Sequence, residues 1–343
     1  MRFALTEDQI DFRDAVRGLL ADTCPADAVR SAWREQVGEV PGGGNGRVPA
    51  AWDALGEMGV LGIMVPESSG GLGMGDEDMV PLLIECGRAG LPDPVSSSAY
   101  VAAGLLRDHS ADSPLLARIA DGSATVLVGF PGSPYLTSAE TADAFLMCDR
   151  GEVHLLTQSD VSLEPVVSVD GARALSRVKW EPTDATVLVG AADGSLAVTQ
   201  AFDRAALGAA AALVGLGERM VDMSVQYAEE RKQFGVAIGT FQAIKHHLAD
   251  AALAVSFAEP LVLRAANSLV HGDPEAPVHV SMAKARASEA ALAVSETALQ
   301  CHGGIGYTVE YDLHFFMKRA WALAARYGDA DFHRDRIRAV VLG

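Results

Sequence analysis

The sequence is short of positive charge, and this deficit excludes several classes of partner. Its 343 residues include 27 lysines and arginines against 45 aspartates and glutamates, giving a formal net charge of −18 at pH 7. Nucleic acids and anionic membranes both attract basic surfaces, so we expect neither as a partner. No apolar run approaches the ~20 residues that a membrane-spanning helix needs. The opening MRFALTEDQIDF carries acids where a signal peptide has its apolar core, so we expect a cytoplasmic protein.

Cysteine is equally scarce. Four cysteines are widely separated and form no CxxC pair: Cys24, Cys86, Cys148 and Cys301. Disulfide frameworks and structural zinc sites are built from closely grouped cysteines. We therefore expect isolated, buried thiols and no metal site.

The hydrophobic residues, 49% of the chain, follow different periods in three successive segments. Residues 1–120 show helical spacing interrupted by loops rich in glycine and proline. Short β-branched runs, among them ATVLVGF, VHLLT and SLAVT, follow over 121–200 and are typical of a small antiparallel sheet or barrel. Helical spacing returns over 201–343, with a break expected near Pro260. The sequence thus predicts an α+β fold: an N-terminal α-helical domain, a reduced middle β-domain and a C-terminal helical bundle.

The stretch Tyr227–Leu248 has the pattern of a helix end, a glycine turn and a new helix start. Gly235 is expected to end the first helix and Thr240 to cap the second. Arg231 would then lie beside a glycine turn and free backbone N–H groups, a combination that suits a phosphate. A helical hairpin with a surface arginine explains the same pattern, and this stretch alone leaves both interpretations open.

A second glycine-rich stretch, Gln300–Asp312, follows the predicted helix over residues 277–299. Its glycines at 303, 304 and 306 would let the backbone approach a ligand closely. A plain helix end and turn would use the same residues. Two such turns at the ends of bundle helices favour a shared surface for an anion or a cofactor.

Together these motifs resemble those of the acyl-CoA dehydrogenase family. The resemblance lies in ERKQFGVAIGTFQAIKHHLADA, QCHGGIGYTVEYDLHFFMKRA and, in the first domain, PESSGGLGMGDEDMV, and it covers essentially the whole chain. It implies the fold of that family, whose C-terminal domain is four-helix-bundle-like. It also implies FAD-dependent removal of the α proton and β hydride of an acyl-CoA thioester, which leaves the 2-enoyl-CoA. The family uses a glutamate as the base.

In this family the C-terminal motifs reach across a subunit interface to the FAD of the neighbouring subunit. The resemblance therefore implies that seven residues contact FAD: Arg231, Gln233 and Phe234 at the pyrophosphate, Gln242 at the adenosine side, and Gln300, Gly303 and Gly304 at the other face of the pyrophosphate. Arginine suits the charge, glutamine offers neutral donors and acceptors, and glycine permits close approach.

The other half of the family's active site is missing from the sequence. The segment like TEPGAGSD that holds the flavin ring has no equivalent in Phe130–Leu146. The two family positions of the glutamate base hold Gly328 and Ala205, which cannot take up a proton. Asp329 and Asp203 lie nearby in sequence. They are weak substitutes, because a helix rotates by ~100° per residue and an offset acid points elsewhere.

These retained and missing sets predict half of an active site. We expect a short, non-catalytic-type subunit of an α2β2 acyl-CoA dehydrogenase, inactive alone, whose longer partner supplies the ring pocket and the glutamate. The resemblance extends to the actinobacterial steroid side-chain type, which implies a bulky, steroid-derived acyl-CoA and an electron-transfer flavoprotein as acceptor. Two alternatives remain: a self-sufficient homo-oligomeric enzyme using Asp329 or Asp203, and a structural subunit with relic flavin motifs.

Overall fold

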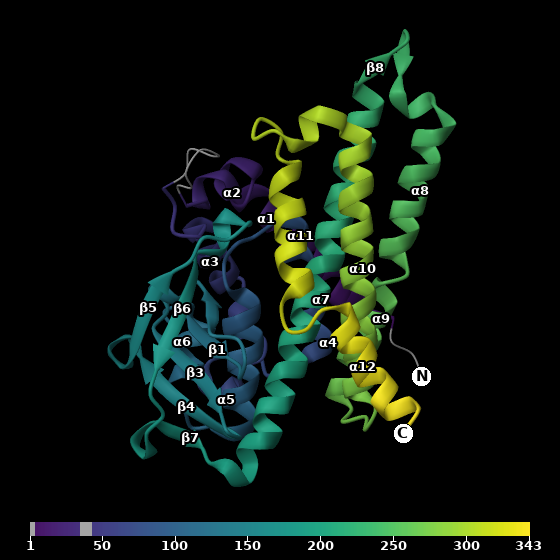
Figure 1. Ribbon diagram of the computed structural model, residues 1–343. Coiled ribbons are helices and arrows are strands. Elements are labelled where there is room, and N and C mark those ends of the chain that lie inside the picture. The colour runs from purple at the N-terminus through teal and green to yellow at the C-terminus, as the bar shows by residue number, and fades with distance from the viewer. Residues whose placement is uncertain (1–3, 35–42) are drawn as a thin grey trace.

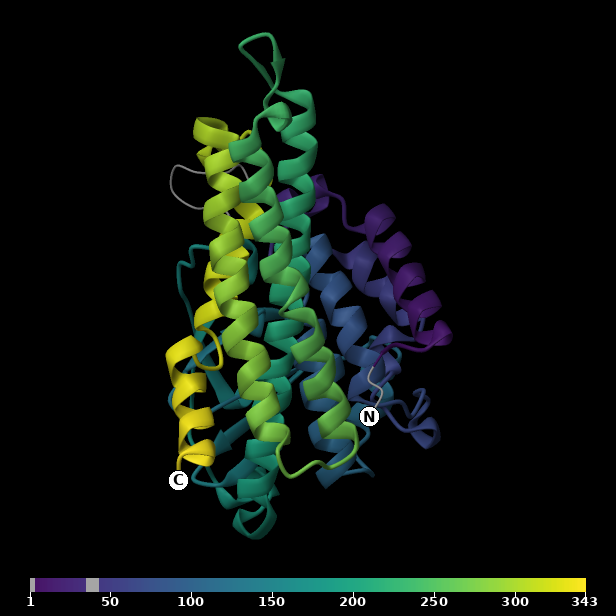
Figure 2. The same cartoon turned by 90° about the vertical axis from the view of Figure 1, so that its right-hand side faces the viewer.

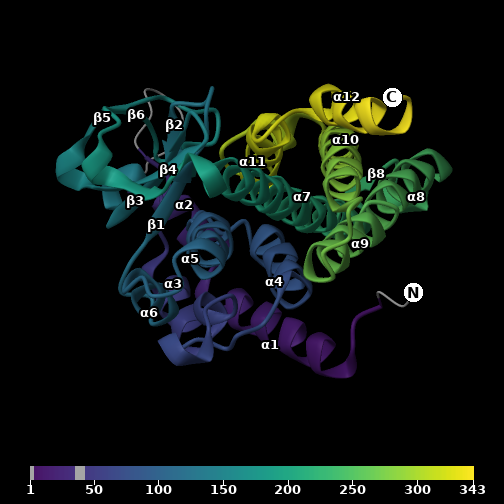
Figure 3. The same ribbon diagram turned by 90° about the horizontal axis from the view of Figure 1, so that it is seen from below.

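The computed structural model describes residues 4–34 and 43–343. Helical regions at both ends of the chain flank a small β-domain, so the predicted α+β fold is confirmed (Figure 1). Viewed from below, the β-domain, the N-terminal helices and the bundle surround one long central helix (Figure 3). The four cysteines are buried free thiols, as predicted. No helix among the described residues is long and apolar enough to cross a membrane.

The N-terminal lobe begins with a side-chain cap. The Thr6 backbone N–H donates to Gln9 Oε1 at 3.0 Å, and the Gln9 N–H donates to Thr6 Oγ1 at 3.2 Å. This reciprocal pair satisfies two donors at the start of the first helix. The lobe contains α1 (Glu7–Thr23), α2 (Ala26–Ala32), α3 (Pro49–Glu57), α4 (Asp76–Ala89), a π-helical segment (Ser96–Ala102), α5 (Ala103–His109) and α6 (Leu115–Ala120).

The β-domain consists of two small sheets rather than one. The first has the order β1 (Val126–Gly129), β3 (Ala144–Asp149), β4 (Glu152–Thr157), β7 (Val187–Val189), and the second β2 (Tyr135–Thr137), β6 (Leu175–Trp180), β5 (Val161–Pro165). Strands β1 and β3 are parallel, so the prediction of a purely antiparallel sheet is wrong for this pair. The chain passes through β2 in the other sheet between them, and a crossover of this kind permits parallel pairing.

The SLAVT run, predicted as a strand, is helical. It lies in α7 (Ala191–Glu230), a helix of 40 residues that begins inside the segment expected to be β-domain. Ala197 and Ala201 are both buried while Leu196 is exposed, so the buried residues recur at the helical spacing. Five residues are too few to distinguish the spacing of a strand from that of a helix, and for this reason the prediction was wrong here.

Helices α8 to α11 pack along α7, and α12 packs on α10, to form the bundle (Figure 2). They are α8 (Gln242–Ser256), α9 (Glu259–Val270), α10 (Ala276–His302), α11 (Leu313–Ala325) and α12 (Ala330–Val341). Pro260 lies in the first turn of α9, so the predicted break at this proline is confirmed. A two-stranded hairpin, β8 (Lys232–Gln233) with β9 (Val236–Ala237), joins α7 to α8 and projects beyond the helices (Figure 2).

The N-terminal lobe is joined to the bundle by a very close contact between α4 and α7. A Cβ added to Gly87 would lie 2.2 Å from the Ala212 carbonyl oxygen, and one added to Gly215 would lie 1.9 Å from the Ile84 carbonyl oxygen. Only glycine allows two helix backbones to approach this closely. The buried Arg204 of α7 adds an ion pair to Asp76 at the start of α4, with an N–O distance of 3.1 Å.

We predict that Gly215→Ala lowers the free energy of unfolding by ~1–3 kcal/mol, because the methyl group forces α4 and α7 apart. Urea denaturation measures this loss. Gly18→Ala is the matched control, since Gly18 lies on the exposed face of α1 with nothing within 4 Å of an added Cβ. That change should leave stability equal or raise it by up to ~1 kcal/mol. Equal losses in the two variants would contradict the close-contact explanation.

Candidate functional site

The residues expected to contact FAD lie together at one end of the bundle, called the bundle tip here. The tip comprises the β8–β9 hairpin, the first turn of α8 and the end of α10 with the following turn (Figure 1). All seven expected residues are exposed there: Arg231, Gln233, Phe234, Gln242, Gln300, Gly303 and Gly304. The two glycine motifs, about seventy residues apart in sequence, thus form one surface.

A stack of aromatic rings holds the two motifs in place. The Tyr227 ring near the end of α7 stacks on the His302 ring at the end of α10, with centroids 4.4 Å apart. Tyr311 packs against the same imidazole at 4.8 Å. His302 Nδ1 is 2.7 Å from the Ala298 carbonyl oxygen, and burial lowers the pKa of the imidazole. His302 therefore packs as a neutral ring, and the stack fixes the separation of the two turns.

Two details of the predicted turn are corrected. Helix α7 ends at Glu230, and Gly235 lies instead at the hairpin turn, where Phe234 and Gly235 have φ of 52° and 84°. Positive φ at both central residues matches the twist of a two-residue hairpin. Phe241, not Thr240, is the N-cap of α8; the Thr240 hydroxyl donates to the Ala237 carbonyl oxygen at 2.7 Å. The hairpin leaves Phe234 93% exposed.

The tip has the chemistry that a diphosphate requires. Arg231 has no acidic partner among the described residues, so its guanidinium is available. Gly303 has φ of +65°, a backbone conformation that favours glycine, so the geometry of the turn alone accounts for this residue. Gly304 has no such φ and nothing within 4 Å of an added Cβ, so the packing of this chain does not require glycine there. Close approach of an external group would explain it, and the tip fits the FAD pyrophosphate.

The turn after α11 contains Gly328, the first expected base position, and disfavours a larger side chain there. Gly328 has φ of +89°, and a Cβ added to it would lie 2.2 Å from Cδ1 of the Phe332 ring. The buried Lys284 of α10 donates to the carbonyl oxygens of Gly328 and Ala324, both at 2.9 Å. A glutamate at position 328 would therefore strain the backbone and force the Phe332 ring to move.

The substitute acids are engaged in structural contacts. Asp203 is buried and forms an ion pair with Arg336 of α12 at 2.8 Å, while burial raises the pKa of its carboxyl group. Asp329 caps α12, where its side chain accepts from the Phe332 N–H at 2.9 Å. Ala205, the second base position, is fully buried in α7. None of these three lines the cavity described below.

Aromatic packing joins the β-domain to the bundle next to this turn. The Phe130 ring lies 5.6 Å from Phe202 and 5.7 Å from Tyr327, between centroids. Phe130 begins the segment that lacks the family's ring-binding motif. Within that segment, Glu140 pairs with Arg34, and Thr137 accepts from Arg326 at 2.8 Å. These two polar side chains of the segment are therefore already engaged by arginines from the N-terminal lobe and from the end of α11.

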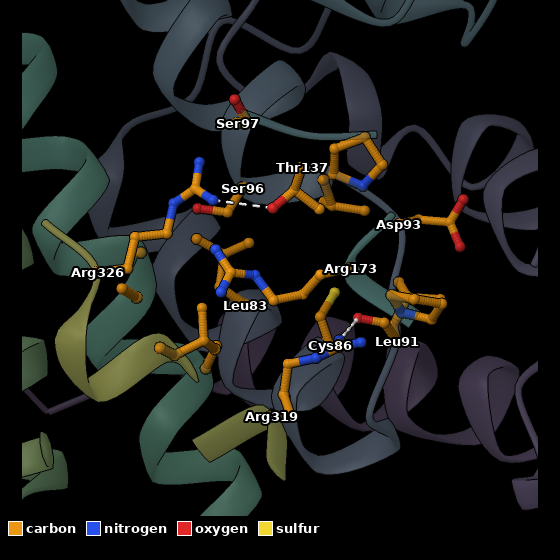
Figure 4. Close-up of a pocket in the computed structure, with 18 of the residues that line it drawn as sticks. Leu83, Cys86, Leu91, Asp93, Ser96, Ser97, Thr137, Arg173, Arg319 and Arg326 are labelled. Atoms are coloured by element: carbon orange, nitrogen blue, oxygen red, sulfur yellow. Dashed lines mark hydrogen bonds between the residues drawn. The ribbon is translucent and has the colours of Figure 1, made fainter. Parts of the chain in front are cut away.

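The structure also contains a cavity that the sequence did not predict. It has a volume of about 120 Å³ and lies among α4, α7, the end of α11 and the β-domain (Figure 4). Its walls are mostly apolar, but three arginines reach it: Arg173 from the β-domain, and Arg319 and Arg326 from α11 and its C-cap. No local motif joins Arg173 to the other two, so sequence reasoning had no signal for the site.

We predict that Gly328→Glu lowers the free energy of unfolding by at least ~2 kcal/mol, from backbone strain at positive φ plus the clash with Phe332. Chemical denaturation provides the measurement. Gly272→Glu is the control, because Gly272 has φ of +60° with nothing within 4 Å of an added Cβ. It should lose only the strain, ~1–2 kcal/mol. If Gly328→Glu is the milder change, the turn is not closed.

A pH effect follows from Lys284. Burial lowers the pKa of its ammonium group to about 7, against ~10.4 in an unfolded chain. Between these values the unfolded chain binds the extra proton, so the free energy of unfolding rises with pH from about 7 upward. Lys284→Met removes the titrating group and should flatten this rise. Urea denaturation at about pH 7, 8 and 9 measures how the free energy of unfolding changes with pH in the unmodified chain and in the variant. The same pH dependence in both would contradict a lowered pKa at Lys284.

Comparisons with known proteins agree with this geometry. Residues 6–110 match the family model described as acyl-CoA dehydrogenase, N-terminal domain, and residues 192–342 match acyl-CoA dehydrogenase, C-terminal domain. The acyl-CoA dehydrogenase IpdE2 of Mycobacterium tuberculosis is 31% identical over 92% of this chain and 91% of its own length. IpdE2 of Mycolicibacterium smegmatis is 32% identical over 98% and 100%.

Solved structures share the fold. The ChsE4-ChsE5 complex from Mycobacterium tuberculosis gives a TM-score of 0.84 at 24% identity, covering 100% of this chain and 99% of the matched chain. A variant of the Tcur3481-Tcur3483 steroid ACAD gives 0.85 at 22% identity, covering 98% of each chain. With the domain matches and the IpdE2 identities, the bundle tip and the α–β–α order lead to one conclusion: the chain belongs to the acyl-CoA dehydrogenase family.

Proposed function

We propose that this chain is the short subunit of a cytoplasmic α2β2 acyl-CoA dehydrogenase. It would supply FAD contacts in trans, while a longer partner chain supplies the flavin-ring pocket and the glutamate base. The observation that carries the proposal is the contrast between two parts of one chain. The bundle tip is open and holds the residues expected to contact FAD, whereas a larger side chain at Gly328 would strain the turn and clash with Phe332.

The tip would act on the adenosine diphosphate half of the partner's FAD. Arg231 would pair with the pyrophosphate, and the backbone at Gly303 and Gly304 would lie against its other face. Gln242 and Gln300 would donate and accept hydrogen bonds beside it. When bound, FAD supplies the hydride acceptance of the dehydrogenation. This chain's residues would bind and orient the cofactor without moving a proton.

Exposed aromatic side chains at the tip support docking of such a partner. Phe234 and Phe241 are 93% and 38% exposed, and their ring centroids lie 6.2 Å apart. Neighbouring exposed apolar side chains are typical of interaction surfaces. A subunit covering this pair would bring its own cofactor to the tip.

The names of similar proteins support the assembly and the substrate class. One is a complex of two differently named chains, and another is called a steroid ACAD. By this analogy the proposed substrate is a bulky, steroid-derived acyl-CoA, oxidised to its 2-enoyl-CoA. The proposed electron acceptor is an electron-transfer flavoprotein, as in the family.

Two alternatives are weaker. A self-sufficient enzyme using Asp203 or Asp329 would require these acids to leave their contacts with Arg336 and the α12 N-terminus. A structural subunit with relic motifs gives no reason for glycine at position 304, where this chain's own packing leaves open space.

The test uses the chain alone and co-expressed with a longer acyl-CoA dehydrogenase chain from the same organism. We predict that the chain alone is colourless and inactive, that the complex holds FAD, and that Arg231→Ala weakens FAD binding by about tenfold or more. Gly304→Leu should also lower FAD content, while the melting temperature of the chain alone stays unchanged. Bound flavin is read from absorbance after gel filtration.

Arg150→Ala is the control, since Arg150 is an exposed cation in the β3–β4 turn. It should leave the flavin content intact. A yellow, active chain on its own would refute the shared-site proposal. Unchanged FAD content and activity in both tip variants would favour the relic interpretation.

A further inference from the structure

The cavity among α4, α7 and the end of α11 holds more positive than negative side chains. Three guanidinium groups and one carboxyl group lie in its wall (Figure 4). The carboxyl group, Asp93, turns away to Arg47, with an N–O distance of 2.6 Å, and accepts from the Val48 N–H at 2.8 Å. Asp93 is thus neutralised from outside the cavity.

One of the three arginines is neutralised in the same way. Arg319 forms an ion pair with the buried Asp170 and donates to the Leu91 carbonyl oxygen at 2.7 Å. Its charge is matched, and its position is fixed between the N-terminal lobe and the β-domain. Arg319 therefore shapes the cavity without leaving a net charge in it.

Arg173 and Arg326 remain without an acidic partner among the described residues. Arg326 donates to the Thr137 hydroxyl at 2.8 Å and lies over the Tyr327 ring at 4.7 Å, both neutral contacts. Arg173 forms no side-chain hydrogen bond with any described residue. Burial, together with the nearby charges of Arg326 and Arg319, lowers the pKa of Arg173 to about 10, and the nearby Asp170 carboxylate only partly opposes this shift. Two mutually repelling cations therefore share one partly enclosed space.

Apolar side chains supply the rest of the wall. Leu83 of α4, Leu216 of α7 and Leu323 of α11 all line the cavity. A volume of about 120 Å³ suits a small ligand, since pockets for drug-sized molecules have ~300–1,000 Å³. An anionic head on an apolar body would match both features, because paired guanidinium groups favour carboxylates.

We propose that this cavity binds a small organic carboxylate, with its head between Arg173 and Arg326 and its apolar body against the leucines. The site is independent of the FAD contacts at the bundle tip. Binding there involves no dehydrogenation, because Asp93 is the one carboxyl group among the described lining residues and is already engaged. This subunit would then keep a binding site of its own beside the closed base turn.

The test titrates the chain, alone and in its complex, with hexanoate, and separately with hexanamide as the uncharged probe of similar shape. Calorimetry should detect saturable hexanoate binding and at least about tenfold weaker binding of hexanamide. Arg173→Gln and, separately, Arg326→Gln should each weaken hexanoate binding by about tenfold or more. Two variants keep the test decisive if one of them does not fold.

Arg177→Gln is the matched control. Arg177 lies four residues from Arg173, is exposed and donates to the Tyr135 hydroxyl outside the cavity. It should bind hexanoate as the unmodified chain does. Equal affinity for hexanoate and hexanamide, or unaltered binding in both cavity variants, would overturn the proposal. So would FAD bound to the chain alone that hexanoate displaces, since the cavity would then be a flavin site.

Discussion

The contact between α4 and α7 is the constraint on which the rest of the structure depends. Their backbones meet where neither Gly87 nor Gly215 has space for a methyl group. This contact fixes the N-terminal lobe against α7, which then continues to the bundle tip. It also sets one boundary of the cavity, since Gly87 and Leu216 both line it. Because α7 is continuous over 40 residues, the lobe, the cavity and the tip are held on one rigid element.

Under the proposed function, the two regions of the site differ in opposite ways along this framework. At the tip, Arg231 has no acidic partner among the described residues, and Gly304 has open space around it. At the turn after α11, Lys284 and Phe332 close the space where a base would be needed. Two contacts contribute: the Lys284 ammonium donates to the Gly328 carbonyl oxygen, and the Phe332 ring occupies the space that a Cβ at position 328 would need. A single substitution at position 328 would therefore not restore the family's chemistry.

Much of this arrangement could be predicted from the sequence, because its signals are local. The capping box at Thr6, the break at Pro260 and the two glycine motifs depend on neighbouring residues. The failures have equally physical causes. SLAVT is too short to distinguish a strand from a helix, and the hairpin at Phe234 was obscured because a glycine after a helix usually marks its end. The convergence of Arg173 with Arg319 of α11 and Arg326 at its C-cap depends on the β-domain meeting the bundle in space, which no local pattern records.

Electrostatics connects these observations. The chain carries a formal charge of −18, and its buried arginines are generally matched: Arg204 by Asp76, Arg319 by Asp170. Against that background, Arg231 at the tip and Arg173 with Arg326 in the cavity lack acidic partners among the residues described. An unmatched cation in an acidic protein favours an anion, and it does so more strongly where burial excludes water. Loss of a base removes proton transfer but not this attraction. Under the two proposals, a subunit without its own catalytic glutamate would therefore still bind anions at two separate places, one facing a partner's cofactor and one in its own partly enclosed cavity.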